Sequence, residues 1–127
     1  KAAVSQNGIS NWLSFFGSSD IGFYFGPDQI GGDPWSNPEG YREKSPLTYA
    51  SKVSTPIMFV HSMNDYRCWI DQSILFYTAL KYLGKETKFV FFMEGSHVFR
   101  SIGKPSLRMK RLNLILEWFE KHLKDKC

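Results

Sequence analysis

Two uninterrupted apolar runs stand out along the chain, one at Ile57–Val60 and one within Lys88–Met93. Each is short and is bounded by proline or polar residues. Runs of this kind are typical of strands that are buried on both faces of a parallel sheet. A shorter apolar run, Ala2–Val4, leads into the polar turn Ser5–Gly8 and predicts the end of another buried strand.

Helical periodicity follows each of the two longer runs. Residues 71–83 predict a helix that Gly84 ends as a left-handed cap, with a stripe formed by Ile74, Tyr77, Thr78 and Lys81 beside Leu75 and Leu80. Residues 106–124 predict a last amphipathic helix, whose apolar stripe is Met109, Leu112, Leu116, Phe119 and Leu123, widened by Ile115. The order strand, helix, strand, helix favours an α/β fold with a right-handed crossover.

The segment between the first two strands is rich in glycine, proline and aromatic residues. Short helices are expected at Ser10–Phe16 and Asn37–Lys44, and Ser45-Pro46 should start another that runs to about Ser51. The rest of residues 9–44 is expected to be connection. A connection this long is more often functional than accidental.

Composition and charge exclude several classes of protein. The 127 residues suffice for one domain, and 43% of them are hydrophobic. The net charge of +4 comes from the segment that begins at Lys104, which holds seven basic and three acidic residues, whereas residues 1–103 are neutral. This pattern indicates a solvated helix face, so we expect no nucleic-acid partner.

Two cysteines, Cys68 and Cys127, do not make a disulfide scaffold, and the three histidines have no metal-ligand spacing. We therefore expect no metal and no cofactor. No apolar run approaches the ~20 residues that span a bilayer, so we expect no membrane partner and a cytoplasmic setting.

An acid and a base follow the two predicted strands at matching places. Asp65 lies five residues after Val60, and His97 lies four residues after Met93. The carboxyl ends of parallel strands share one rim, and neighbouring strands are about 4.8 Å apart, so these side chains can form a hydrogen bond. A carboxylate on one ring nitrogen orients the imidazole as a general base. The alternative is that both are solvated loop residues.

The sequence has no nucleophile to match this pair. No serine stands in a Gly-x-Ser-x-Gly elbow, where the strained turn needs small neighbours. Ser10 is followed two residues later by Trp12, where a small residue is required, and Cys68 lies on the loop of the acid itself. Neither is expected to serve as the nucleophile.

Several segments together carry a resemblance to a known family: Ala2–Trp12, Gly32–Trp35 with Ser45–Tyr49, Pro56–Gln72, and Glu94–His97 followed by Arg100 and Lys104-Pro105. They resemble the C-terminal catalytic domain of the prolyl oligopeptidase family of serine peptidases, especially its acylaminoacyl peptidase branch. The resemblance implies the C-terminal portion of an α/β-hydrolase three-layer sandwich with a mostly parallel sheet. Asp65 then corresponds to the triad acid and His97 to the triad base, while Arg67 and Gln72 match structural positions.

The sequence departs from the family pattern near these residues. Ser62 stands where the family usually has Gly, Trp69 where it has Pro, and Val98 where Gly is frequent. The family's serine elbow, oxyanion hole and β-propeller lie upstream of the segment that begins at Lys1. Residues 1–127 are therefore expected to be the C-terminal part of the catalytic domain, with Ala2–Val4 as a strand entering from upstream.

The resemblance implies that the substrates are short peptides, some of them N-acylated. The aromatic connection is a candidate wall for an apolar side-chain pocket, and substrate contacts are expected at Phe15, Phe16, Phe23 and Val98. Alternatively, these rings only pack the connection onto the sheet. Two other functions stay open: an esterase of the same fold, and a non-catalytic hydrolase fragment. The fragment would act in folding or assembly, through self-association at a sheet edge or by pairing with the missing N-terminal part.

Overall fold

The computed structural model describes residues 1–124 and is built on a three-stranded parallel sheet. Its strands are β1 (Ala3–Gln6), β2 (Ile57–Ser62) and β3 (Thr87–Phe92), in the order β1-β2-β3. Phe59 of β2 is in register with Ser5 of β1 and with Phe89 of β3. The parallel pairing predicted from the two apolar runs is confirmed.

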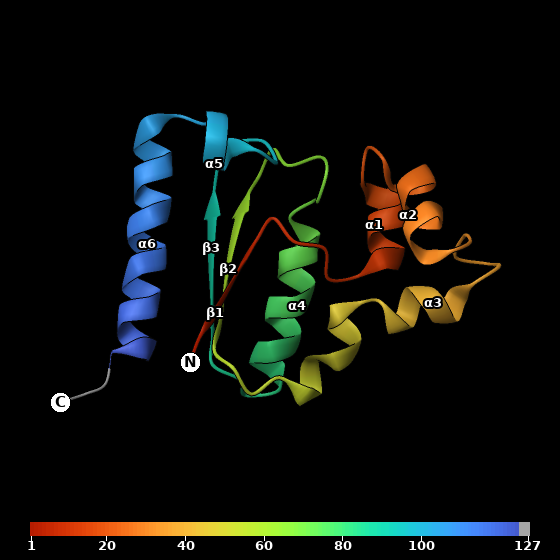
Figure 1. The fold of residues 1–127 in the computed structure, drawn as a ribbon, viewed down its shortest axis with the longest axis horizontal. Coiled ribbons are helices and arrows are strands. Elements are labelled where there is room, and N and C mark those ends of the chain that lie inside the picture. The colour runs from red at the N-terminus through yellow and green to blue at the C-terminus, as the bar shows by residue number, and fades with distance from the viewer. Residues whose placement is uncertain (125–127) are drawn as a thin grey trace.

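Two long helices cover the two faces of this sheet, α4 (Asp71–Tyr82) on one and α6 (Pro105–Leu123) on the other (Figure 1). The core under α6 is centred on Met58, Val60, Phe92, Phe99 and Trp118. The core under α4 is centred on Ala50, Phe59 and Leu80. Alternate residues of β2 thus enter opposite cores, which is why its whole run is apolar. The α/β class is confirmed, with three layers.

The long connection forms a helical unit of its own beside α4 (Figure 1). It contains α1 (Trp12–Ser18), α2 (Gly22–Ile30), α3 (Pro38–Glu43) and the 3₁₀ helix η1 (Pro46–Lys52). The helices expected at Ser10–Phe16 and Asn37–Lys44 are present with shifted ends, but α2 was not predicted. Its Pro27 and two glycines argue against a helix locally. A Cβ at Gly22 would lie 2.2 Å from the Phe15 carbonyl oxygen, so the close approach of α1 and α2 requires this glycine.

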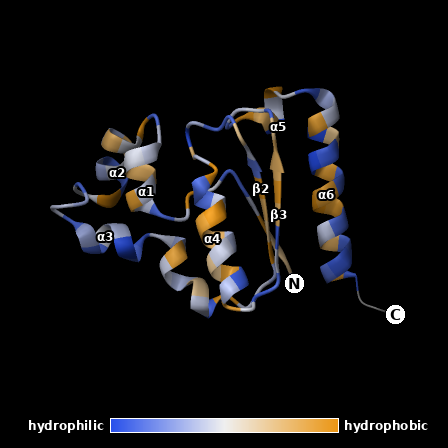
Figure 2. Ribbon diagram, turned by 180° about the vertical axis from the view of Figure 1, so that it is seen from behind, coloured by the Kyte–Doolittle hydropathy of each residue, from blue (hydrophilic) through white to orange (hydrophobic). Residues whose placement is uncertain are grey.

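The predicted apolar stripe of α6 is wrong as a description of its buried face. Ile115 and Phe119 pack against the core, but Met109, Leu112, Leu116 and Leu123 are exposed. The buried face is instead set by Arg111 and Trp118, whose side chains donate to Gln6 Oε1 and to the Ala3 carbonyl oxygen of β1. Figure 2 shows apolar residues spread around α6 rather than confined to the side facing the sheet.

The stripe expected on α4 is also only partly correct. Leu80 is fully buried and Tyr77 packs beside it, but Ile74 and Leu75 are exposed, and Gln72 and Ser73 take the buried places. Both polar residues bond to groups outside the helix, to Ser10 and to His61. In the part of the chain that the structure describes, no helix has the length and apolarity to cross a membrane.

Candidate active site

Asp65 lies in the loop that follows β2, and its carboxylate is held from four directions. Oδ1 accepts hydrogen bonds from the backbone N–H groups of Arg67, at 3.0 Å, and Cys68, at 2.9 Å. Oδ2 accepts one from Asn7 Nδ2 and lies 2.9 Å from His97 Nδ1. Asp65 is 1% exposed. Its orientation is therefore fixed by the loop and by the end of β1.

His97 lies in the loop after β3, on the same rim as Asp65. Gly95 has φ +113°, and a Cβ there would lie 2.7 Å from Phe99 Cβ, so this tight turn needs glycine. The turn presents the His97 ring over Asp65, with its side chain 34% exposed. Because Nδ1 faces a carboxylate, it carries the proton, and Nε2 is left as the basic nitrogen.

Asn7 and Ser62 tie the two loops together from beneath. Asn7 Nδ2 also donates to Ser62 Oγ, at 3.2 Å, and Ser62 Oγ donates to the Ser96 carbonyl oxygen, at 3.1 Å. This carbonyl belongs to the residue directly before His97. Sequence reasoning missed Asn7, although Asn before Gly at the end of a strand is a turn signal, and its φ of +49° is one that Asn tolerates.

A second histidine, His61 of β2, is buried behind the acid loop. Its Nε2 lies 2.7 Å from the Cys68 carbonyl oxygen, and its Nδ1 lies 2.7 Å from Ser73 Oγ. A carbonyl can only accept, so Nε2 carries the proton and Nδ1 accepts from the serine hydroxyl. Burial lowers the pKa of His61, which keeps the ring neutral. His61 thus fastens the acid loop to α4.

The two alternative nucleophiles are both engaged in the packing. Ser10 is buried, and its hydroxyl donates to the Gln72 carbonyl oxygen at 2.5 Å, while Gln72 Oε1 accepts from the backbone of Ser10 and Asn11. Cys68 is buried, and burial raises the pKa of its thiol to about 12. Neither side chain is prepared to attack a substrate.

An apolar pocket of about 270 Å³ opens beside His97, lined by Ile9, Phe15, Ile21, Phe25, Arg67, Cys68 and His97. Of the residues expected to bind substrate, Phe15 belongs to this wall. Val98 lies with His97 in a neighbouring hollow. Phe16 instead packs on Trp35 and Tyr41, and Phe23 is 67% exposed against Tyr24, so neither lines the pocket.

Arg67, which lines this pocket, forms an ion pair with Asp20. Arg67 Nε donates to Asp20 Oδ1 at 2.8 Å, and Nη2 donates to Oδ2 at 3.2 Å. The Arg67 guanidinium lowers the pKa of Asp20. Because Asp20 follows α1 and Arg67 follows β2, the pair joins the helical unit to the acid loop.

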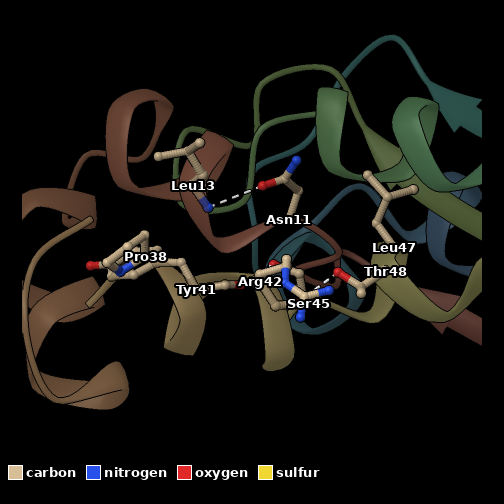
Figure 3. A pocket seen from close by; sticks show the side chains of 8 residues that line it. All are labelled: Asn11, Leu13, Pro38, Tyr41, Arg42, Ser45, Leu47 and Thr48. Carbon is tan, nitrogen blue, oxygen red and sulfur yellow. Dashed lines mark hydrogen bonds between the residues drawn. The ribbon is translucent and has the colours of Figure 1, made fainter. Parts of the chain in front are cut away.

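A second hollow of about 280 Å³ lies away from His97, between α1, α3 and η1 (Figure 3). It shares no residue with the pocket beside His97; its lining includes Leu13, Tyr41, Ser45 and Leu47. Ser45, expected as a helix cap, accepts a hydrogen bond from the Trp12 N–H and donates to the Tyr41 carbonyl oxygen. Within residues 1–124 no cluster of three His, Cys, Asp or Glu side chains is placed to hold a metal ion.

A parallel sheet between helical layers, with a carboxylate after one strand and a histidine after the next, is the arrangement of an α/β-hydrolase. Comparison with known proteins agrees with this class. The sequence profile of the "Prolyl oligopeptidase family" matches residues 1–126. The chain therefore belongs to the prolyl oligopeptidase family.

Three relatives show how close the similarity is. The chain is 47% identical over 123 residues to the "Uncharacterized peptidase YuxL" of Bacillus subtilis. The aligned residues cover 97% of this chain and 19% of that protein. A solved acylaminoacyl peptidase of Pyrococcus horikoshii is 45% identical with a TM-score of 0.92, covering 100% of this chain and 21% of that one. An acylaminoacyl peptidase in complex with Z-Gly-Gly-Phe-chloromethyl ketone is 47% identical with a TM-score of 0.88, and the match covers 94% of this chain and 19% of that one. The chain thus spans about a fifth of the relatives it matches.

Proposed function

We propose that this chain is the C-terminal part of a serine-type peptidase, to which it contributes Asp65 as the triad acid and His97 as the triad base. The observation that carries the proposal is the 2.9 Å contact between Asp65 Oδ2 and His97 Nδ1 on the shared rim of the sheet. The nucleophilic serine and the oxyanion hole would come from another segment of the polypeptide. The family membership supports this division.

In the proposed mechanism each residue has a distinct task. His97 Nε2 takes the proton of the serine hydroxyl as that oxygen attacks the scissile carbonyl, and returns it to the leaving group. Asp65 keeps the proton on Nδ1 and stabilises the imidazolium that forms. Because four donors already fix the carboxylate, it needs no rearrangement when the charge on the ring appears.

The apolar pocket beside His97 supports a peptide substrate with a large apolar side chain next to the scissile bond. Its walls are aromatic and aliphatic, with Phe15, Phe25 and Ile21 contributed by the helical unit. One relative is bound to a peptide chloromethyl ketone that ends in Phe. Substrates that are short, and N-acylated in part, are consistent with the names of these relatives.

The test is turnover of an acyl-aminoacyl substrate by the full-length protein carrying Asp65→Asn or His97→Ala. Each change should lower kcat by about three to four powers of ten. Matched controls are Asp28→Asn on the exposed side of α2 and His122→Ala near the end of α6, which should keep near wild-type turnover. Near wild-type turnover in either site variant would contradict the proposal.

The chain by itself should lack activity, because both of its alternative nucleophiles are buried. Treating the isolated 127-residue chain with a fluorophosphonate probe should give no covalent adduct, whereas the full-length protein should be labelled at one serine. Labelling of the isolated chain would place the nucleophile inside it. Since the same triad cleaves esters, a panel of matched amide and ester substrates separates peptidase from esterase.

A further inference from the structure

Three arginines surround a hollow of about 270 Å³ at the start of α6, and this hollow shares no lining residue with the pocket beside His97. Arg100 comes from α5 (Phe99–Ile102), and Arg108 and Arg111 come from the first turns of α6. The other lining residues are Pro105, Met109 and Leu112. The hollow therefore combines a concentrated positive charge with an apolar border.

Arg111 is the unusual member of this cluster because it is only 8% exposed. Its Nη1 donates to Gln6 Oε1 at 2.5 Å, while Nε is buried with no acceptor. Burial and the neighbouring charges of Arg100 and Arg108 lower its pKa. Among residues 1–124, none of the ion pairs involves any of the three arginines.

A buried guanidinium such as that of Arg111 destabilises the fold unless an anion pairs with it. A buried ion costs several kcal/mol unless it is paired, and most buried donors in folded proteins have an acceptor. Gln6 supplies one neutral oxygen, which satisfies one of the five guanidinium N–H groups. The planar fork of an arginine matches a carboxylate better than any other common partner.

The surroundings favour a carboxylate that is carried by polypeptide over a free ion. Met109 and Leu112 border the hollow and are 57% and 49% exposed. An inorganic anion would leave these side chains in water, whereas a packed segment would cover them. Gln6, which Arg111 contacts, is the last residue of β1, and β1 has a partner strand on one side only within the described sheet.

We propose that Arg111, with Arg100 and Arg108 beside it, receives an Asp or Glu side chain from another segment of the same polypeptide, which packs over Met109 and Leu112 next to β1. This inference depends on one part of the proposed function, namely that the chain is one part of a longer protein. We assign the cluster to assembly of the catalytic domain rather than to substrate binding, because its hollow shares no lining residue with the two hollows that His97 lines.

Thermal unfolding of the full-length protein tests the proposal. Arg111→Gln keeps a donor for Gln6 but removes the charge, and it should lower Tm by at least about 5 °C. Arg42→Gln removes an exposed arginine that pairs with Glu39 on α3, and it should change Tm by less than about 1 °C. A Tm for Arg111→Gln that equals that of the wild type would overturn the proposal.

Two further measurements identify the source of the anion. Added phosphate at constant ionic strength should leave the wild-type Tm unchanged. If the wild-type Tm instead rises with phosphate concentration to a plateau, and Arg111→Gln abolishes this rise, the cluster binds a small anion and the polypeptide source is overturned. In the Arg111→Glu background, changing each Asp and Glu outside residues 1–127 to Lys should yield one variant that restores Tm, and failure of every variant would overturn the polypeptide source. Turnover is measured separately from stability. If Arg111→Gln has a lower Tm but an unchanged kcat/KM at a temperature where it is folded, the cluster acts in stability and the proposed function is unaffected.

Discussion

Asn7 offers the sharpest test of how the site is held, because it combines a buried hydrogen bond with an unusual backbone. Its Nδ2 donates to the Asp65 carboxylate and to Ser62 Oγ, and its φ is +49°. A hydrogen bond to a charged group contributes about 2 kcal/mol. Holding an alanine in the left-handed region costs about 1 kcal/mol more than holding a glycine there.

These two magnitudes predict an order of stability for two variants. Asn7→Gly loses only the hydrogen bonds and should lower the free energy of unfolding by about 2 kcal/mol. Asn7→Ala loses the hydrogen bonds and adds the backbone strain, so it should lose about 3 kcal/mol. The kcat should fall equally in both variants, since both release the same oxygen of Asp65. Exposed Asn64 in the acid loop gives the control Asn64→Ala, expected within about 0.5 kcal/mol of wild type.

Urea unfolding of the full-length protein measures these changes in the free energy of unfolding. They should appear as a lower midpoint urea concentration with an unchanged dependence of the free energy on urea. If Asn7→Gly is as stable as the wild type, the bond to Asp65 contributes nothing. If Asn7→Ala is no less stable than Asn7→Gly, the positive φ of residue 7 causes no strain that glycine relieves.

Three further predictions concern charge, reactivity and backbone. The Glu86 carboxylate forms hydrogen bonds with Lys121 Nζ and His122 Nε2 of α6, and these contacts, that of Lys121 foremost, lower its pKa from 4.5 to about 2. Because the pKa of Glu86 is lower in the folded protein than in the unfolded chain, the ionised carboxylate stabilises the fold. The Tm difference between wild type and Glu86→Gln should therefore be fully present above pH 4.5 and should vanish as the pH falls toward 2. The Cys68 thiol, with its pKa at about 12, should react with iodoacetamide at pH 8 far more slowly in folded than in urea-unfolded protein, and equal rates would contradict its burial. Gly95→Ala should clash with Phe99 and displace His97, lowering stability by about 1–3 kcal/mol and kcat by at least about tenfold; an unchanged kcat would show that the turn does not position the ring.

The sheet and the pairing of Asp65 with His97 could be predicted because they depend on local signals. Apolar runs of strand length, each followed by a polar loop, are visible in the sequence at Ile57–Val60 and Lys88–Met93. Parallel strands then bring their following loops to one rim, so the meeting of the two side chains follows from topology. The structure places their nitrogen and oxygen 2.9 Å apart.

The buried face of α6 could not be predicted from periodicity, because the helix carries two competing stripes. Met109, Leu112 and Leu116 form the more apolar one, yet Arg111 and Trp118 lie on the other, which faces the sheet. What decides between them is a set of hydrogen bonds to β1, more than a hundred residues away in the sequence. The same holds for Asn7, whose partners Ser62 and Asp65 are brought to it only by folding.

A double-mutant cycle on kcat measures whether Asp65 acts through His97. In the full-length protein, Asp65→Asn and His97→Ala should each lower kcat by about three to four powers of ten. If the two residues act as one unit, the double variant should be no slower than the slower single variant. A double variant in which the loss of kcat is the product of the two single losses would show that Asp65 and His97 act independently, so that Asp65 does not act through His97.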